Sequence, residues 1–306
     1  MDNELLLFDR IEVIKATDKK YDLEHNAYLS FSGGKDSTVL HYLLDMALPN
    51  NLIPRVFINT GIEYQAITEF VKELASKDDR FVIVQPSQPI KPTLEKYGYP
   101  FKSKQHSHTL AIYQHSGMSR AVRVYLGQDV TKTGNSGKMF LCPKQLRYQF
   151  TDEFKIKCSD LCCKKLKKEP AEKWCKANKR TVTITGMRKE EGGARQTLGC
   201  IVTDKDGHIK KYHPLVKVDS EWEDWFVSTH NIQLCKLYYP PFNLVRTGCA
   251  GCPFALNLQN ELDTMEELLP NEKKKCEVIW KPIYEEYRRL NYRLRSTEQL
   301  TLWEED

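Results

Sequence analysis

The fold is decided by the stretch Ala27-Tyr28-Leu29-Ser30-Phe31-Ser32-Gly33-Gly34-Lys35-Asp36-Ser37-Thr38. An apolar run ends in two glycines and a helical pattern follows at once, which predicts a strand, a tight turn and the start of a helix. Glycine has no Cβ and turns the backbone at little steric cost. The first amides of a helix carry partial positive charge, to which Lys35 adds a full charge and Ser32, Ser37 and Thr38 add donors. We therefore expect the turn to bind phosphate, pyrophosphate or sulfate.

The common nucleotide-binding patterns do not fit this turn. A Walker A loop requires a glycine, four further residues and then Gly-Lys-Ser/Thr, whereas Asp36 follows Lys35 here. The dinucleotide pattern G-x-G-x-x-G does not occur in this stretch either. The alternative is an ordinary turn between a strand and a helix, which often uses Gly and Ser. The combination of residues in this setting favours an anion site.

Composition and charge set the broad class of the protein. The chain has 306 residues, of which 41% are apolar, enough for a substantial core. A net charge of +5, from 46 basic and 41 acidic residues, says little about partners. No apolar run approaches the ~18 residues of a membrane span. The first residues are acidic and lack the basic start of a secretory signal, so we expect a cytoplasmic protein without a membrane partner.

Apolar periodicity and turn residues predict the secondary structure. Helices are expected at 4–16, 37–48, 65–77, 220–231 and 272–290, and strands at 27–31, 55–59, 81–85 and 181–185. Residues 201–212 are expected to form a β-hairpin around Asp206-Gly207, and residues 97–145 an irregular insertion. The alternation predicts an α/β fold with a doubly wound, mostly parallel sheet. We expect an N-terminal helix (1–20), an α/β domain (21–239) and, after Pro240-Pro241, a small helical, cysteine-bearing subdomain (240–306).

Two further strings fall at predicted strand ends. In parallel sheets, ligands bind beyond the carboxyl ends of the strands. Asn59-Thr60-Gly61 therefore is expected to face the same pocket as residues 32–38. A third strand leads to Gly186-Met187-Arg188, and Arg195 follows. Arginine suits phosphate because its guanidinium is planar and always charged, so Arg188 and Arg195 are predicted anion binders; the alternative is a solvated charge cluster.

The ten cysteines all lie between Cys142 and Cys276. A reducing compartment disfavours structural disulfides, so ligation of a metal or cluster is the expected explanation. Cys162-Cys163 is a tandem pair, and Cys249-Ala250-Gly251-Cys252 is a C-x-x-C motif. Lysines after the tandem pair favour thiolates. The remaining cysteines are expected to be small buried apolar residues.

These strings together resemble one family. Ser32-Gly33-Gly34-Lys35-Asp36-Ser37 resembles the PP-loop of the ATP pyrophosphatases. The string at 57–64 resembles the "DTG-x-E" strand end of phosphoadenosine phosphosulfate (PAPS) reductases, with Asn59 where that family often has Asp. Gly186 to Arg195 resembles their "G-x-R-x-x-E-S-x-x-R" segment, with Gly192 in place of the serine. The chain thus resembles the PAPS reductase family of the PP-loop superfamily, which implies an adenine nucleotide alpha hydrolase-like fold.

The resemblance implies chemistry at the α-phosphate of ATP, or binding of PAPS or adenylylsulfate (APS). It assigns catalytic roles to Lys35, Asp36 and Arg188. It also implies Mg²⁺ bridging the phosphates, with Asp36 as its ligand or organiser. The expected nucleotide- and phosphate-binding residues are Ser30, Ser32, Gly33, Gly34, Lys35, Asp36, Ser37, Thr38, Asn59, Thr60, Gly61, Glu63, Gly186, Arg188 and Arg195.

The cysteines resemble the CC…CxxC set of assimilatory adenylylsulfate reductases, in which four thiolates hold a [4Fe–4S] cluster. The resemblance implies that Cys162, Cys163, Cys249 and Cys252 are its ligands. Zinc is the competitor, because four cysteines also suit tetrahedral Zn²⁺. Adjacent ligands strain a single-metal site, whereas a cluster presents a different iron to each, which favours iron–sulfur.

The end of the chain separates three functions. Assimilatory reductases carry a nucleophilic cysteine in a C-terminal "ECG-x-H" tail, whereas no cysteine follows Cys276 here. This favours the branch in which ATP adenylylates an acceptor, here a nucleic acid, and sulfur replaces the adenylate. The first alternative is a PAPS or APS reductase that releases sulfite with a thioredoxin-like donor. The second is a non-catalytic nucleotide- or nucleic-acid-binding module, suggested by the basic run at 164–180. A sulfur-donor protein and a homodimer are further expected partners.

Overall fold

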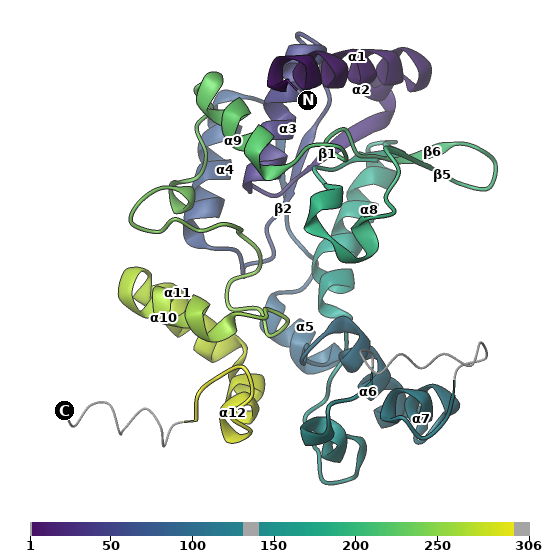
Figure 1. Cartoon of the computed structure of the whole chain (residues 1–306), viewed down its shortest axis with the longest axis vertical. Coiled ribbons are helices and arrows are strands. Elements are labelled where there is room, and N and C mark those ends of the chain that lie inside the picture. The colour runs from purple at the N-terminus through teal and green to yellow at the C-terminus, as the bar shows by residue number, and fades with distance from the viewer. Residues whose placement is uncertain (1, 131–140, 297–306) are drawn as a thin grey trace. The chain divides into compact units, whose positions relative to one another are not determined.

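A computed structural model describes residues 2–130 and 141–296 of the chain (Figure 1). The part of the predicted insertion at 131–140 and the C-terminal tail at 297–306 lie outside the described residues. The tail, whose sequence contains no cysteine and on which the choice between the three functions depends, therefore lies outside the described residues.

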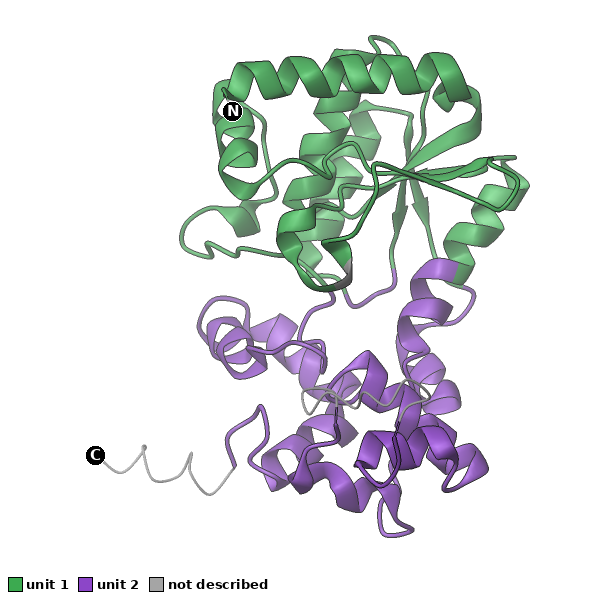
Figure 2. Cartoon of the chain, turned by 45° about the vertical axis from the view of Figure 1, so that its right-hand side comes forward, with its two compact units in different colours: residues 1–59, 63–86, 169–248 green, residues 60–62, 87–168, 249–306 purple. Residues whose placement is uncertain are grey.

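The chain divides into two compact units, each assembled from separate segments (Figure 2). Unit 1 comprises Met1–Asn59, Glu63–Pro86 and Glu169–Gly248, and unit 2 comprises Thr60–Ile62, Ser87–Lys168 and Cys249–Asp306. The predicted division into domains at 20/21 and 239/240 stays a prediction.

Unit 1 is built on a six-stranded sheet of order β3-β2-β1-β4-β6-β5. Its strands are β1 (Ala27–Phe31), β2 (Arg55–Ile58), β3 (Phe81–Val84), β4 (Val182–Ile184), β5 (Ile201–Thr203) and β6 (Ile209–Tyr212). Every neighbouring pair is parallel except β5 and β6, which form the predicted antiparallel hairpin. The mostly parallel α/β fold expected from the sequence is confirmed.

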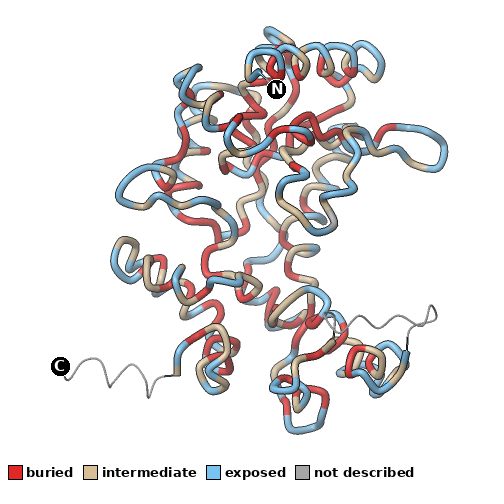
Figure 3. The backbone as a smooth tube through the Cα atoms, viewed as in Figure 1, coloured by how far each residue is buried: buried red, intermediate tan, exposed pale blue. Residues whose placement is uncertain are grey.

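Helices cover this sheet and supply most of its core. They are α1 (Asn3–Tyr21), α2 (Leu23–Asn26), α3 (Lys35–Ala47), α4 (Gln65–Lys77), α8 (Glu169–Ala177) and α9 (Ser220–Thr229). The predicted apolar stripe of α3, which includes Val39, Leu40, Leu43 and Leu44, is fully buried, and α3 packs against β1, α1 and α9. Each such side chain contributes about 1.5–3 kcal/mol of burial free energy. Figure 3 colours the chain by burial: β1 and β2 are mostly buried, whereas β5 is not.

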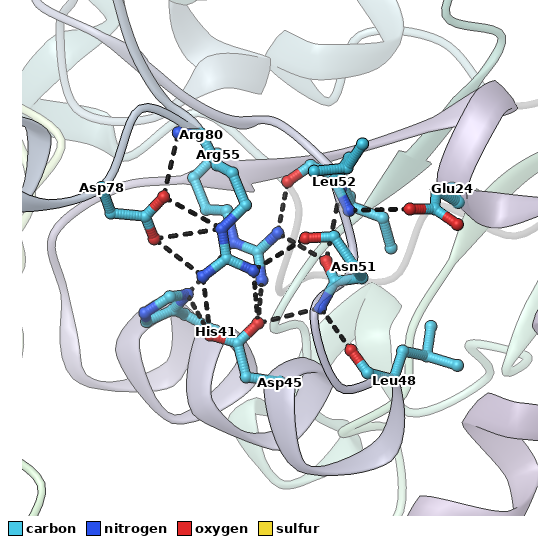
Figure 4. A network of polar contacts seen from close by, with 10 residues as sticks. Glu24, His41, Asp45, Leu48, Asn51, Leu52, Arg55, Asp78 and Arg80 are labelled. Carbon is cyan, nitrogen blue, oxygen red and sulfur yellow. Dashed lines mark hydrogen bonds and ion pairs between the residues drawn. The ribbon is translucent and has the colours of Figure 1, made fainter.

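A buried ionic network fixes the amino-terminal edge of the sheet (Figure 4). Arg55, the first residue of β2, is fully buried and donates to Asp45 at 2.6 Å, to Asn51 at 2.8 Å and to His41 Nδ1 at 3.1 Å. Arg80, just before β3, donates to Asp45 at 2.7 Å and to Asp78 at 2.7 Å. A buried charge is tolerable only when it is paired and hydrogen-bonded, and here it is. This edge is thus devoted to stability, and the opposite edge carries the loop at 32–38.

Unit 2 is helical. Its elements are α5 (Ile90–Tyr97), α6 (Lys104–Ser116), α7 (Arg120–Leu126), the 3₁₀ helix η2 (Lys144–Phe150), the π-helical turn η3 (Lys164–Lys168), α10 (Leu258–Leu268), α11 (Pro270–Ile279) and α12 (Lys281–Arg289). Within the described part of the chain, no helix combines the length and the apolar character that crossing a bilayer requires.

The prediction of an irregular insertion at 97–145 is wrong where the structure describes it, because α6 and α7 occupy much of it. Serines cap both helices: Ser103 accepts from the amide of His106, and Ser119 from that of Val122. The buried face of α6 includes polar side chains, among them His106, which hydrogen-bonds Tyr125 at 3.0 Å and Gln149 at 2.8 Å. Hydrogen bonds thus replace the apolar periodicity by which a helix is recognised in sequence.

The single helix predicted at 272–290 is two helices, α11 and α12, which meet at Trp280. Pro282 lies in the first turn of α12, where a missing amide costs no helical hydrogen bond. The Trp280 indole donates to the carbonyl of Ala250 at 3.1 Å, so the break between the helices helps to hold the C-x-x-C segment.

Candidate functional site

Two glycines allow the turn between β1 and α3. Gly33 has φ of +72°, and a Cβ at this position would lie 2.8 Å from Ile67 Cγ2. Gly34 has an extended backbone, and a Cβ there would lie 3.2 Å from the hydroxyls of Ser32, Thr247 and Tyr238. Glycine at position 33 is therefore required both by the backbone conformation and by close packing. Gly34 is surrounded by three side-chain hydroxyl groups.

The hydrogen bonds of the loop leave amides available at the start of α3. Ser32 donates its amide to Ser37 Oγ at 3.2 Å, and the amide of Lys35 donates to the Tyr238 hydroxyl at 2.9 Å. Ser37 and Thr38 turn their hydroxyls back to the carbonyl of Gly34, at 2.9 and 3.0 Å. Among the described residues, no group accepts a hydrogen bond from the amides of Asp36 or Ser37. These first-turn N–H groups are the kind that bind anions at helix N-termini.

Arg188 connects the end of β4 to this loop. Its Nε donates to Asp36 Oδ1 at 2.8 Å, and its Nη1 donates to Glu190 at 2.6 Å and to Ser220 Oγ at 3.2 Å. Gly186 makes the approach feasible, because a Cβ there would lie 2.9 Å from the carbonyl oxygen of Asp36. The predicted residues Gly186, Arg188, Asp36 and Lys35 are thus brought together at the carboxyl edge of the sheet.

Acidic residues from α9 also reach this cluster. Lys35 Nζ pairs with Asp224 at 2.6 Å, and Arg188 Nη2 lies 3.4 Å from Glu223 Oε2. Glu223 is fully buried, and neither of its carboxyl oxygens has a hydrogen-bond partner among the described residues. Burial, reinforced by the Asp36 carboxylate, raises the pKa of Glu223 to about 8, and Arg188 opposes that rise.

The sequence prediction missed Glu223, Asp224, Tyr238 and Thr247. Glu223 leaves a faint signal, because helical periodicity places position 223 beside the apolar positions Trp222 and Phe226. Tyr238 and Thr247, whose hydroxyls lie 2.7 Å apart, leave none, because they belong to a segment without regular periodicity.

Other predicted site residues lie apart from the loop. Ser30 is an exposed residue within β1, paired in register with Val56. Arg195 forms an ion pair with Glu191, as does Arg246, and the structure records no contact of Arg195 with residues 32–38.

The segment after β2 crosses between the two units. The amide of Asn59 donates to Val84 at 2.9 Å and ends the sheet pairing of β2. Thr60 and Glu63 are buried, and Gly61 has φ of +83° and is exposed. Asn59 and Glu63 belong to unit 1, whereas Thr60 and Gly61 belong to unit 2. Whether these residues bind nucleotide stays a prediction.

The four predicted ligand cysteines all belong to unit 2 and interact with one another. The sulfurs of Cys162 and Cys163 are 3.9 Å apart. The hydrogen bond between them, burial and nearby charge on Cys252 and Cys249 raise the pKa of Cys162. The same hydrogen bond lowers the pKa of Cys163 to about 6, and Lys104, Lys167 and Lys168 act in the same direction. The chemistry of four sulfur donors suits a metal or cluster. Among the described residues no three of these sulfurs lie within 4.8 Å of one another, so the ligand set stays a prediction.

The C-x-x-C turn is held by α11 and α12. The Tyr284 hydroxyl donates to the carbonyl of Gly251 at 2.5 Å, and the Tyr287 hydroxyl donates to that of Pro253 at 2.8 Å. Gly251 has φ of +57°, and a Cβ there would lie 2.9 Å from Cys276 Sγ. Burial raises the pKa of Cys276 to about 12. Cys276 therefore behaves as a packing residue behind the turn, as expected for the cysteines outside the predicted ligand set.

One group of at least three metal-ligand side chains lies close together among the described residues, and it contains no cysteine. Asp204, Asp206 and His208 place ligand atoms within 4.8 Å of one another at the tip of the β5–β6 hairpin. Asp204 accepts from the amides of Asp206 and His208, at 3.0 and 2.9 Å. The carboxylate thus already caps the turn.

Comparison with known proteins places these features in a family. A family model, described as the phosphoadenosine phosphosulfate reductase domain, matches residues 26–135 and 138–255. An uncharacterised protein of Methanocaldococcus jannaschii is 26% identical over 245 residues, which are 79% of this chain and 44% of that protein. The chain therefore spans less than half the length of this relative.

Solved structures show only a distant likeness. Candida auris phosphoadenylyl-sulfate reductase has a TM-score of 0.40 and 16% identity, covering 69% of this chain and 76% of its own. Candida glabrata FMN adenylyltransferase in complex with ATP has a TM-score of 0.42 and 15% identity, covering 76% of this chain and 58% of its own. The U34-tRNA thiolase NcsA of Methanococcus maripaludis with its [4Fe–4S] cluster has a TM-score of 0.38 and 16% identity, covering 92% of this chain and 80% of its own. All three TM-scores lie below 0.5, so these structures do not extend the assignment.

The family model spans the loop at 32–38, the Gly186–Arg188 segment and the C-x-x-C motif. These are the segments in which the sequence strings and the site geometry coincide, and the chain belongs to the phosphoadenosine phosphosulfate reductase family.

Proposed function

We propose that this protein is a PP-loop enzyme that acts at the α-phosphate of ATP in sulfur transfer to a nucleic acid. The observation that carries the proposal is the pair of first-turn amides of α3, on Asp36 and Ser37, which have no acceptor among the described residues and lie beside Lys35 and Arg188. A phosphate placed there gains backbone donors, the helix dipole and two cationic side chains.

The charges around the loop suggest how the nucleotide is bound. Lys35 and Arg188 pair with three carboxylates, those of Asp36, Glu190 and Asp224. Glu223 also lies beside Arg188, but burial raises its pKa to about 8 and favours the neutral form. A polyphosphate must compete with those carboxylates, which makes a divalent countercharge favourable. Mg²⁺ accompanying the nucleotide would supply it, with Asp36 as ligand or organiser. Lys35 and Arg188 would then stabilise charge that develops on the phosphates as pyrophosphate leaves.

Cys162, Cys163, Cys249 and Cys252 would hold a [4Fe–4S] cluster, and zinc remains the competitor. The support is their common location in unit 2 and the thiolate character of Cys163. Such a cluster supplies a site at which sulfur can be bound and delivered. Anaerobically purified protein with iron, labile sulfide and absorption near ~400 nm would support the cluster, whereas one zinc per chain would select the competitor.

The test of the proposed reaction is release of pyrophosphate from ATP. Lys35→Ala should lose at least about 100-fold in rate, because one well-placed electrostatic contact contributes about 3 kcal/mol to transition-state stabilisation. Lys205→Ala, an exposed lysine of the β5–β6 turn, is the matched control and should keep the wild-type rate. Equal turnover in wild type and Lys35→Ala would reject the assignment.

Family membership favours a second candidate, a sulfonucleotide reductase that releases sulfite from PAPS or APS. The attacking thiol would then come from a cysteine outside the ligand set or from a partner protein. Buried Cys276 is unsuited, because burial raises its pKa to about 12. Sulfite release with a thioredoxin-like donor would establish this reaction, and its absence in protein with intact metal would remove it. A sulfur-donor partner, a homodimer and a cytoplasmic location stay predictions.

A further inference from the structure

Unit 2 contains an open groove that neither the family strings nor the proposed nucleotide site accounts for. Its volume is about 730 Å³, and its lining comes from α5, α6 and the segment that precedes the tandem cysteines. Tyr97, Tyr113 and Phe154 give it aromatic walls, while Gln114, Thr151 and Ser159 add polar groups. A groove of this mixed character is unlike the continuous apolar face that an amphipathic helix would need.

The two tyrosines present usable faces. Tyr97 and Tyr113 are half-buried, and Tyr113 rests on Phe150 with ring centroids 5.7 Å apart. The Tyr113 ring is therefore packed against one aromatic neighbour while part of its surface stays accessible. Phe154 is buried and is the third aromatic residue of the lining. Rigid, half-exposed aromatic rings are the usual platforms on which bases stack.

Lysines surround these rings. Lys165 Nζ lies 4.7 Å from the centroid of the Tyr97 ring, and Lys96 Nζ lies 5.3 Å from it. Lys155 and Lys157 line the groove itself, against one acidic lining residue, Asp152. Lys165 belongs to the basic run at 164–180. The Tyr97 ring therefore lies beside the first turn of this basic run.

A second hollow continues the same arrangement. It measures about 300 Å³, and Phe154 and Lys155 line both hollows. The Arg289 guanidinium lies 5.2 Å from the centroid of Tyr148 at this second site, where Glu153 and Glu286 are the acidic lining residues. The aromatic and cationic pairing thus recurs along a path rather than at one point.

We propose that this groove binds a single-stranded nucleic acid, with bases on Tyr97 and Tyr113 and phosphates on Lys155 and the lysines at 164–168. The inference rests on the proposed function and names the place of its acceptor. Cys158, Ser159 and Leu161 line the groove, and Cys162 and Cys163 follow directly in the chain. A strand held here would lie beside the tandem cysteines, where sulfur transfer requires it.

The test is binding of fluorescein-labelled single-stranded 20-nucleotide RNA and DNA, followed by anisotropy over a range of salt concentrations. Tyr113→Leu keeps an apolar contact with Phe150 but removes the stacking face, and it should weaken binding about tenfold, as loss of one base–aromatic stack does. Lys155→Ala should lower the slope of log K against log salt by about 0.7, the value for one phosphate contact on a single strand.

The controls are Phe8→Ala, an exposed aromatic residue of α1, and Lys205→Ala. Both should bind as wild type. Unchanged affinity in Tyr113→Leu, an equal loss in the controls, tighter binding of duplex than of single strands, or no binding at all would each overturn the proposal. Pyrophosphate release from ATP without nucleic acid, measured on the same variants, separates the outcomes: failure of the groove leaves the Lys35 dependence intact, and failure of the loop leaves oligonucleotide binding intact.

Discussion

Arg188 Nη2 lies 3.4 Å from Oε2 of Glu223, a fully buried carboxyl whose oxygens accept no hydrogen bond from the described residues. Burial without hydrogen bonds, together with the nearby Asp36 carboxylate, outweighs the Arg188 charge, so this group favours its neutral form. The pKa of about 8 expresses that preference. The loop thus gains an oriented arginine without a second full negative charge beside Asp36.

Glu223→Gln should make stability less dependent on pH. Because the folded-state pKa is raised above the unfolded value, the stabilisation is complete below about pH 4.5 and is lost as pH rises to about 8. Wild type should therefore lose on the order of a few kcal/mol relative to Glu223→Gln across that window. Urea unfolding at half-unit pH intervals measures the difference. Glu221→Gln, an exposed residue of the same helix, should follow wild type; parallel profiles for Glu223→Gln and wild type would contradict the prediction.

Gly33→Ala should damage the loop through both backbone and packing. The φ of +72° opposes any Cβ, and the new methyl group would meet Ile67 at 2.8 Å. We expect a loss of about 2–4 kcal/mol and of pyrophosphate binding. Gly207→Ala, with φ of +83° but open space around it, isolates the backbone contribution at about 1 kcal/mol. Equal unfolding midpoints for the two variants would show that the contact with Ile67 is unimportant.

Tyr238→Phe should weaken folding and strengthen phosphate binding. The hydroxyl accepts from the amide of Lys35 at 2.9 Å, and burial raises its pKa, so it stays a neutral hydroxyl. Its removal leaves that amide unsatisfied, at a cost of about 1–3 kcal/mol in the free protein. A phosphate oxygen would satisfy the amide again, so calorimetry should find tighter binding of inorganic pyrophosphate. Weaker pyrophosphate binding together with an unchanged melting temperature would contradict the prediction, because the hydroxyl would then contribute to phosphate binding and not to folding.

His41 should make unit 1 sensitive to acid. Burial, with the Arg55 charge, lowers its pKa to about 4, below the unfolded value near 6.5. Its contribution is present above pH 6.5 and is lost as pH falls toward 4, by about 3 kcal/mol. His41→Gln should flatten the melting temperature between pH 6.5 and 4, whereas His25→Gln, an exposed histidine of α2, should not. A drop of the same size in His41→Gln would point to other groups.

The sequence predicted unit 1 far better than unit 2, for a physical reason. A near-continuous apolar strand such as β1, and a helix with one apolar face such as α3, can be recognised from a short stretch of sequence alone. The buried face of α6 includes His106, satisfied by Gln149 more than forty residues away. Glu223 and Tyr238 likewise reach the loop only through tertiary packing. The site residues that sequence motifs identified lie at strand ends. The residues that contact them, such as Glu223 and Tyr238, could not be predicted from the spacing of residues in the sequence.

Cys163→Ser should abolish metal or cluster binding, whereas Cys142→Ser should not. The pKa of Cys163 is about 6, and its lysine neighbours stabilise the thiolate. The thiolate is therefore present near neutral pH, and metal binding does not have to be preceded by an unfavourable deprotonation. Burial instead raises the pKa of Cys142 to about 11, and its thiol lies against the carbonyl of Pro143 at 3.6 Å. Iron, zinc and labile sulfide are measured after anaerobic purification, with the melting temperature as a check on folding. Wild-type metal content in Cys163→Ser, or equal loss in both variants, would remove the tandem pair from the ligand set. The phosphate-binding loop at 32–38 would then be the only proposed chemical site that this result leaves standing.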